Sequence, residues 1–264
     1  MGKTRRPFKI DDIRAVMFDL DGTIYCGSKV IPGANDTIGF FREHDVSVFF
    51  TTNNSTKTRR QIHKRLVGMG IDWRLEEVLT SGYLAGLYAL RNDLSDVYVF
   101  GSSNLENELE DMGVSVSRDE SASNLLVGYD PEMSYEGLAA AVRVALNADC
   151  LMACNRERVY PGEGGVLLPG CGAMTAPIEW CSGREFDVVI GKPSTLMAEI
   201  VSDELSVSPR EILVVGDTYE SDVLMARRAS CRTILITDVR RTDVRTVHSV
   251  ADLPYLLALS QMEK

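Results

Sequence analysis

Short apolar segments alternate with helical patterns in the first and last thirds of the chain, and this alternation limits the fold more than any other feature. In the first third, strands are predicted at 15–18 and 46–51, and helices over 33–44 and from Ser55 or Thr56 to Gly70. In the last third, strands are predicted at 187–190, 212–215 and 233–236, and helices over 194–206 and 223–229. Continuous apolar strands are typical of a parallel sheet covered by helices on both faces. We therefore predict an α/β fold with a doubly wound, Rossmann-like parallel sheet core.

The middle of the chain has strands and helices of its own. Strands are predicted at 97–100, 125–127 and 151–153, and helices over 104–112 and 135–147. About 100 residues is enough for a complete domain. The predicted organisation is a core made of residues 1–83 and 184–264, with a second α/β domain inserted over 84–183.

Composition excludes several classes of protein. The chain has 264 residues, of which 45% are hydrophobic and 25% charged, as in an ordinary globular protein. A net charge of −10 argues against nucleic acid or an anionic membrane as the main partner. No apolar run reaches membrane-spanning length, the N-terminal segment lacks a signal-peptide pattern, and the six cysteines lack zinc-site spacing. We expect a cytoplasmic protein with reduced thiols.

Two carboxylates follow the first predicted strand. Alternation along a strand sends Asp19 and Asp21 to the same face, at a turn that contains Gly22. Two like charges this close are unfavourable unless they share a metal ion or a proton. An Asp-Gly turn is also common without any function, so this pair needs support from the rest of the chain.

Three further predicted strands end in polar residues. The segment 51–55 offers hydroxyls and amides before a helix N-terminus, which suits anion binding, although Ser55 could simply cap that helix. Lys192 follows the strand at 187–190, and Asp217 and Asp222 follow the strand at 212–215. Right-handed crossovers place the carboxyl ends of parallel strands at one edge of a sheet. Carboxylates favour Mg²⁺, and together these groups indicate a phosphoryl-transfer centre.

These motifs resemble a known family. The segment 19–23, the Thr52-Asn53 loop, Gly191-Lys192-Pro193 and the segment 216–222 resemble the four ordered motifs of the haloacid dehalogenase-like superfamily of phosphatases. The segments 31–34 and 169–172 are similar to the branch with NagD-like, p-nitrophenyl phosphatase and pyridoxal phosphatase proteins. In that branch a large α/β cap domain lies between the second and third motifs, which implies that 84–183 is such a cap.

The resemblance implies a role for each motif residue. Asp19 would be the nucleophile that forms an aspartyl-phosphate, and Asp21 would protonate the leaving alcohol and then activate water. An aspartate at 21 favours hydrolysis, since the superfamily's ion-pumping ATPases carry threonine there. Thr52 and the Asn53 backbone would bind phosphate oxygens, and Lys192 would neutralise charge. Mg²⁺ would be bound by Asp19, the Asp21 carbonyl and Asp217, with Asp222 in support, beside a mobile flap at 25–31.

The implied activity is Mg²⁺-dependent hydrolysis of small-molecule phosphate monoesters, such as nucleotide, sugar or related metabolite phosphates, with p-nitrophenyl phosphate as a surrogate. Substrate choice would lie in the cap loop 127–135, for which we single out Asp130, Glu132 and Tyr135. This loop lacks the histidine that pyridoxal phosphatases tend to have, which favours other substrates. Family caps often carry dimer contacts, which implies a homodimer through the cap.

Other details of the cap leave alternatives open. Asn155-Arg156-Glu157 resembles an Asn-x-Asp pattern with glutamate in place of aspartate. Arg156 or Arg158 could bind a second anionic group of the substrate, although exposed arginines are more common.

Two other classes of protein use a similar fold. One is a phospho-acceptor signalling module, which would be about half as long, and the other is a metal-free dehalogenase, which would need neither Asp21 nor Asp217.

Overall fold

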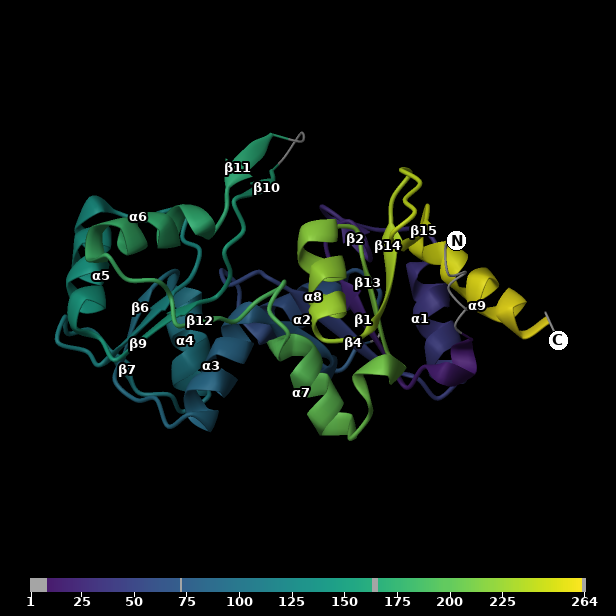
Figure 1. Cartoon of the computed structure of the whole chain (residues 1–264), viewed down its shortest axis with the longest axis horizontal. Helices are drawn as coiled ribbons and strands as arrows, with labels where there is room; N and C mark the ends of the chain where they lie inside the picture. Colours follow the sequence, from purple (N-terminus) through teal and green to yellow (C-terminus); the bar gives the residue numbers. More distant parts are fainter. Residues whose placement is uncertain (1–8, 72, 163–165, 263–264) are drawn as a thin grey trace. The chain divides into compact units, whose positions relative to one another are not determined.

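The computed structural model describes residues 9–71, 73–162 and 166–262, and these form two compact units (Figure 1). The first unit contains the described residues up to Thr51 and those from Ala198 onward, and the second unit contains Thr52–Met197. The chain therefore leaves the first unit once and returns to it. The cap boundaries predicted from the sequence, 84 and 183, stay a prediction.

A parallel sheet forms the centre of the first unit. The first unit contributes five strands to this six-stranded sheet, in the order β15 (Arg245–Val247), β14 (Arg232–Ile236), β13 (Ile212–Gly216), β1 (Ala15–Asp19) and β4 (Ser47–Thr52). Phe18 of β1 lies opposite Val215 of β13 and Phe50 of β4, and Asp19 lies opposite Thr51. Because every pair is parallel, the carboxyl ends of all five strands lie at one edge of the sheet.

Helices cover both sides of these strands. In Figure 1, α8 (Leu224–Arg228) lies on one side, and α1 (Ala34–Glu43) and α9 (Leu253–Met262) lie on the other. The ring of Phe18 packs 5.7 Å from that of Phe41 in α1. The remaining elements are a small hairpin of β2 (Tyr25–Cys26) and β3 (Lys29–Val30), most of α7 (Leu196–Leu205), and 3₁₀ turns at Ile10–Asp12, Pro209–Glu211 and Val250–Asp252.

The second unit has its own parallel sheet. Its strands lie in the order β12 (Val188–Val189), β9 (Cys150–Ala153), β8 (Asn124–Val127), β6 (Val97–Phe100) and β7 (Val116–Ser117). A buried apolar core that includes Leu125, Val144 and Ile178 joins this sheet to α5 (Tyr135–Asn147) and α6 (Gly172–Ser182). The other elements are η2 (Leu75–Glu77), β5 (Val78–Thr80), α2 (Arg59–Gly68), α3 (Ser81–Arg91), α4 (Ser103–Asp111), and a hairpin of β10 (Val159–Pro161) and β11 (Leu167–Pro169).

The predicted α/β class with a parallel sheet core is confirmed, but one strand was placed in the wrong sheet. The strand predicted at 187–190 is β12, which pairs with β9 in the second unit. An apolar run identifies a buried strand but not its neighbours, so the sequence pattern alone did not distinguish the two sheets. The pattern also missed α3, α6, α9, β15 and the β10–β11 hairpin.

Two predictions about the environment of the chain can be compared with the structure. Across 9–71, 73–162 and 166–262, no helix has the length and apolarity needed to span a membrane. All six cysteines lie in these ranges as free thiols, in line with the expectation of reduced cysteines.

Candidate active site

Three carboxylates converge at the carboxyl edge of the first unit's sheet. Asp19 ends β1, and Asp217 and Asp222 follow the neighbouring strand β13. One carboxylate oxygen from each residue lies within 4.8 Å of the other two. Asp222 is only 1% exposed, Asp19 is half-buried and Asp217 is exposed. The cluster therefore extends from the protein interior to solvent, and its oxygens suit a hard cation.

The segment after β13 folds Asp222 back over the end of its own strand. Tyr219–Val223 forms a π-helical turn, in which the Asp222 main-chain N–H donates to the Thr218 carbonyl at 2.9 Å. The Thr218 N–H donates to Asp222 Oδ2 at 3.2 Å. A Cβ on Gly216 would lie only 2.2 Å from Cγ of Asp222. The glycine is therefore required for the buried carboxylate to approach the strand.

The turn after β1 packs against Asp217. Gly22 has φ of +79°, and its N–H donates to the carbonyl of Tyr25 at 2.8 Å. A Cβ at Gly22 would lie 2.0 Å from Oδ2 of Asp217. Both the backbone conformation and the lack of space therefore require glycine. Gly22 therefore allows the turns after β1 and β13 to pack closely against each other.

The side chain of Asp21 lies outside the three-carboxylate cluster. It is exposed, and the Tyr25 hydroxyl donates to its Oδ2 at 3.0 Å. The predicted ligand from this residue is its main-chain carbonyl, which stays a prediction. Asp222, expected only to support the metal site, supplies an oxygen to the cluster itself.

In the second unit, hydrogen bonds fix the main chain of the Thr52-Asn53 loop. The Asn53 carbonyl accepts from Ser81 Oγ and from Asn155 Nδ2, each at 2.8 Å. Oγ1 of Thr52 accepts from the Asn54 N–H at 3.1 Å. Thr52, Asn53, Ser81 and Asn155 are all buried. The Asn-x-Asp-like pattern included Asn155 without connecting it to this loop, and no pattern indicated Ser81, because both residues lie far from the loop along the chain.

The Asn53 side chain joins the two remaining predicted segments of this unit. Its Nδ2 donates to Oε1 of Glu157 at 2.8 Å and to the carbonyl of Lys192 at 2.9 Å. Lys192 is itself only 2% exposed. A Cβ on Gly191 would lie 2.4 Å from Oδ1 of Asn53, so the glycine before Lys192 permits this close packing. A lysine buried to this extent needs partners for its charge.

The predicted specificity residues of the cap loop lie on the surface of the second unit. Glu132 and Tyr135 are exposed, Tyr135 to 79%, and Asp130 is half-buried with Oδ1 accepting from the Glu132 N–H at 3.0 Å. The preceding residue, Tyr129, shares a hydrogen bond of 3.0 Å with the hydroxyl of Tyr160. Burial, together with this bond, raises the pKa of Tyr129 to about 12. This tyrosine pair was not predicted, because its only signal in the sequence was its proximity to glycine- and proline-rich segments.

The two arginines considered for substrate binding are both exposed. Arg156 forms an ion pair with Glu179 of α6. Arg158 contributes its main-chain carbonyl, which accepts from the Gly170 N–H at 2.9 Å. Neither observation assigns these side chains to a ligand.

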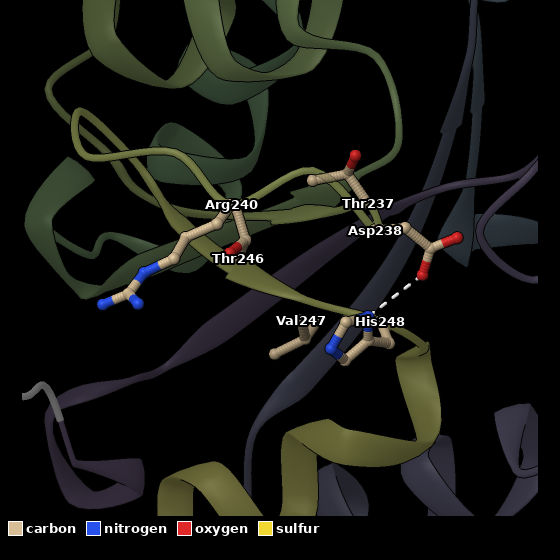
Figure 2. A pocket seen from close by; sticks show the side chains of 6 residues that line it. All are labelled: Thr237, Asp238, Arg240, Thr246, Val247 and His248. Atoms are coloured by element: carbon tan, nitrogen blue, oxygen red, sulfur yellow. Dashed lines mark hydrogen bonds and ion pairs between the residues drawn. The ribbon is translucent and has the colours of Figure 1, made fainter.

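A separate cavity of about 220 Å³ lies at the carboxyl ends of β14 and β15, lined by Thr237, Asp238, Arg240, Thr246, Val247 and His248 (Figure 2). Nδ1 of His248 lies 3.0 Å from Oδ1 of Asp238. Both side chains are largely exposed, at 77% and 94%, so solvent screens their interaction. None of the residues predicted from the motifs lines this cavity.

The structure thus brings the predicted residues together in two sets. Asp19, Asp217 and Asp222 form the acidic set of the first unit. Asn53 and Lys192 belong to the buried set of the second unit, where Thr52 precedes Asn53. Asp21 stands beside the first set on its glycine turn.

Comparisons with known proteins agree with these motifs. A model of haloacid dehalogenase-like hydrolases matches residues 16–115, and a related HAD-hydrolase-like model matches 189–254. An acid sugar phosphatase of Staphylococcus haemolyticus is 31% identical over 260 residues, covering 95% of this chain and 97% of the relative.

Similar structures have been solved. The p-nitrophenyl phosphatase from Archaeoglobus fulgidus has a TM-score of 0.86 and 27% identity, covering 94% of this chain and 99% of its own. NagD from E. coli has a TM-score of 0.81 and 25% identity, covering 91% of this chain and 98% of its own. The predicted resemblance is confirmed: this chain belongs to the haloacid dehalogenase-like hydrolases and is an enzyme of their phosphatase branch.

Proposed function

We propose that this protein is a Mg²⁺-dependent phosphatase that hydrolyses small-molecule phosphate monoesters through an aspartyl-phosphate on Asp19. The observation that carries the proposal is the convergence of Asp19 with Asp217 and Asp222 at the end of β1. A carboxylate nucleophile needs opposite charge nearby when it meets a phosphate dianion. Two further carboxylates next to it would only increase the repulsion unless a cation is bound among them.

The donor set fits Mg²⁺. All three oxygens of the cluster are carboxylate oxygens, which are hard ligands, and the cluster contains no sulfur or imidazole. In the proposal Asp19, Asp217 and the main-chain carbonyl of Asp21 hold the ion, and Asp222 supports it. Bound Mg²⁺ supplies positive charge that offsets the charges of the phosphate and the nucleophile.

The reaction proceeds in two displacements at phosphorus. The Asp19 carboxylate forms a bond to phosphorus while the bond to the ester oxygen breaks, and Asp21 gives its proton to that leaving oxygen. Asp21 then takes a proton from water, whose oxygen displaces the Asp19 carboxylate and releases inorganic phosphate. The hydrogen bond from the Tyr25 hydroxyl holds Asp21 beside its turn between the two steps.

The phosphate oxygens are bound by the second set of residues in this proposal. Thr52 and the Asn53 backbone donate hydrogen bonds to them, and the ammonium group of Lys192 offsets their charge. The buried, fully bonded loop carbonyl of Asn53 supports this assignment, because it fixes the main chain in advance of binding.

Among the substrate classes considered, we propose sugar phosphates first. The basis is the kinship with the staphylococcal acid sugar phosphatases. Asp130, Glu132 and Tyr135 remain the proposed specificity residues of the cap. A homodimer through the cap and a cytoplasmic location stay predictions.

A hydrolysis screen tests the proposal. Protein loaded with Mg²⁺ is incubated with p-nitrophenyl phosphate, sugar phosphates, nucleoside monophosphates, phosphoglycolate, glycerol phosphate and pyridoxal phosphate, and phosphate release is measured. We expect turnover of p-nitrophenyl phosphate and faster turnover of at least one sugar phosphate. EDTA should abolish both reactions, and added Mg²⁺ should restore them.

The variant Asp19→Asn is expected to lower kcat by roughly 10⁴-fold or more, the scale seen when a catalytic nucleophile is removed. Its circular dichroism spectrum should match that of the wild type. Normal hydrolysis by this variant would show that Asp19 is not the nucleophile. Activity that survives complete metal removal would favour the dehalogenase alternative, and Asp19 phosphorylation lasting minutes without ester turnover would favour the signalling module.

A further inference from the structure

Glu157 stands in the cap segment whose pattern was left unexplained, and the structure gives it a specific contact. Its Oε1 accepts a hydrogen bond from Nδ2 of Asn53, 104 residues earlier, at 2.8 Å. We infer that Glu157 is a positioning residue, which fixes the Asn53 side chain and through it the loop that binds the phosphate group. The inference rests on the proposed function, in which that loop holds phosphate oxygens.

Both hydrogens of the Asn53 amide are used. One bonds to Glu157 Oε1 and the other to the main-chain carbonyl of Lys192 at 2.9 Å. The amide oxygen Oδ1, in contrast, is buried and has no hydrogen-bond partner among the described residues. The observed orientation therefore satisfies the two donors and leaves the acceptor unpaired.

The carboxylate of Glu157 decides this orientation. A hydrogen bond to a charged acceptor is roughly twice as strong as a neutral one, which offsets the cost of the unpaired Oδ1. Without the carboxylate, only the hydrogen bond to the Lys192 carbonyl would hold the amide, and its second N–H would lose its acceptor. An amide held by one bond would be more mobile, which would loosen the connection between the Asn53 loop and the segment that carries Lys192.

The main chain around Glu157 is itself held firmly. Its N–H donates to Oδ1 of Asn155 at 3.0 Å, and its carbonyl accepts from the Gly172 N–H at 2.8 Å. A Cβ at Gly170 would lie 2.4 Å from that carbonyl oxygen. Asn155 also donates a hydrogen bond to the Asn53 carbonyl. The segment with Asn155 and Glu157 therefore holds both the main chain and the side chain of Asn53.

Steady-state kinetics with p-nitrophenyl phosphate test the inference. We expect Glu157→Ala to lower kcat/KM by about tenfold or more, and Glu157→Gln, which keeps a neutral acceptor oxygen at the same length, to recover only part of that loss. Asn53→Ala should have a similar effect, and the double variant should be no worse than Asn53→Ala alone, because contacting residues are non-additive. Glu120→Ala is the matched control, since Glu120 is an exposed glutamate of the same unit that pairs with the exposed Arg143, and it should stay within twofold of wild type.

A second measurement separates this inference from the proposed function. Hydrogen exchange followed by mass spectrometry should show faster exchange of the main-chain amides at 53–57 in Glu157→Ala, and not in Glu120→Ala. If Glu157→Ala does not fold, Glu157→Met removes the acceptor while filling similar volume. A wild type that hydrolyses no ester refutes the proposed function, while the exchange data still test the positioning. The inference would be overturned by unchanged amide exchange at 53–57 in Glu157→Ala. It would also be overturned if the losses of kcat/KM in the two single variants multiplied in the double variant.

Discussion

The polar clusters of the two units differ in how their groups are paired. In the first unit, oxygens of three carboxylates lie within 4.8 Å of one another, and in the proposed function a bound Mg²⁺ ion offsets their charge. In the second unit, the loop at Asn53 is bonded by neutral and charged groups of the same unit, with donors matched to acceptors at 2.8–2.9 Å. In the proposed function the first arrangement gains stability from a bound cation, whereas the second is formed before any ligand binds.

The strongest test of this difference is Asp217→Asn. Removing one of the three carboxylates is expected to weaken Mg²⁺ affinity on the order of 100-fold. Loss of a residue that only supports a metal ligand already weakens metal affinity by up to about 100-fold. It should also raise the melting temperature of metal-free protein, because one repulsive charge is gone. Calorimetric titration and thermal melts with and without Mg²⁺ measure both effects.

The control for this variant is Asp238→Asn, which neutralises another exposed aspartate that follows a strand of the same sheet. It should leave Mg²⁺ affinity unchanged. Equal affinities for Asp217→Asn and the wild type would show that the cluster does not bind the ion.

The second test acts on the other unit. Asn155→Ala removes the bond to the Asn53 carbonyl and the acceptor of the Glu157 N–H, and both are buried or partly buried. We expect the free energy of unfolding to fall by about 2 kcal/mol, the usual cost of leaving such groups unpaired. The loss should be the same with and without Mg²⁺ in urea denaturation. Asn147→Ala, in which the amide is exposed on α5, should change stability little, and a Mg²⁺-dependent loss in Asn155→Ala would contradict the comparison.

The third test concerns the space around Asp217. Gly22→Ala would place a Cβ on Oδ2 of Asp217 and also strain a left-handed backbone. We expect Mg²⁺ affinity to fall by about tenfold, equivalent to roughly 1.4 kcal/mol. Gly27→Ala provides the matched control, because Gly27 has φ of +59° but no atom within 4 Å of the position that a Cβ would take. Equal losses of affinity in the two variants would mean that backbone strain, and not the contact with Asp217, is responsible.

The smallest expected effect concerns Asp243 of the first unit, whose carboxylate already has two arginine partners. The Tyr219 hydroxyl donates to Asp243 at 2.6 Å, and Arg241 and Arg227 each approach the carboxylate at 3.1 Å. These contacts, led by the tyrosine bond, hold the pKa of Asp243 well below its usual range. A lowered folded-state pKa means that the stabilisation is complete above the ordinary pKa of aspartate and is lost as pH falls through the lower, folded-state value.

The melting temperatures of wild type and Asp243→Asn should therefore differ by a small, constant amount from pH 7 to pH 5. The difference should shrink only below about pH 4, the ordinary pKa of the unfolded aspartate. Added Mg²⁺ should not change it, in contrast to Asp217→Asn. A difference that vanishes between pH 5 and pH 7 would contradict this account.

Local sequence patterns were sufficient to predict the helices and strands whose ends are set by neighbouring residues. The strand at 97–100 and the helix at 135–147 have the bounds that periodicity predicted, and Ser134 caps that helix through a hydrogen bond from the Gly137 N–H. The motif spacing likewise placed acidic residues after β1 and β13. These features depend on residues within a few positions of one another.

The rest depends on contacts between distant segments. No local pattern connects Asn53 with Glu157, or Tyr219 with Asp243, because the partners are 104 and 24 residues apart. The π-helical turn that brings Asp222 back to Gly216 could not be predicted from sequence periodicity either, because rare turns of this type are set by tertiary contacts. The sequence motifs predicted the candidate site residues, but the structure was needed to identify the contacts that hold them.

The path of the chain also has a consequence for protein synthesis. β1 pairs with β13, and Ala15 lies opposite Ile212 in this pairing. β1 is therefore synthesised about 200 residues before its partner strand. At a ribosomal rate of about 5–20 residues per second, this delay is roughly 10–40 s. During that time the apolar strand that ends in Asp19 lacks the neighbour that will bury it, while the second unit, Thr52–Met197, has emerged as one continuous stretch. Chaperones that shield short apolar segments on the ribosome would therefore bind β1 before its partner β13 has been made.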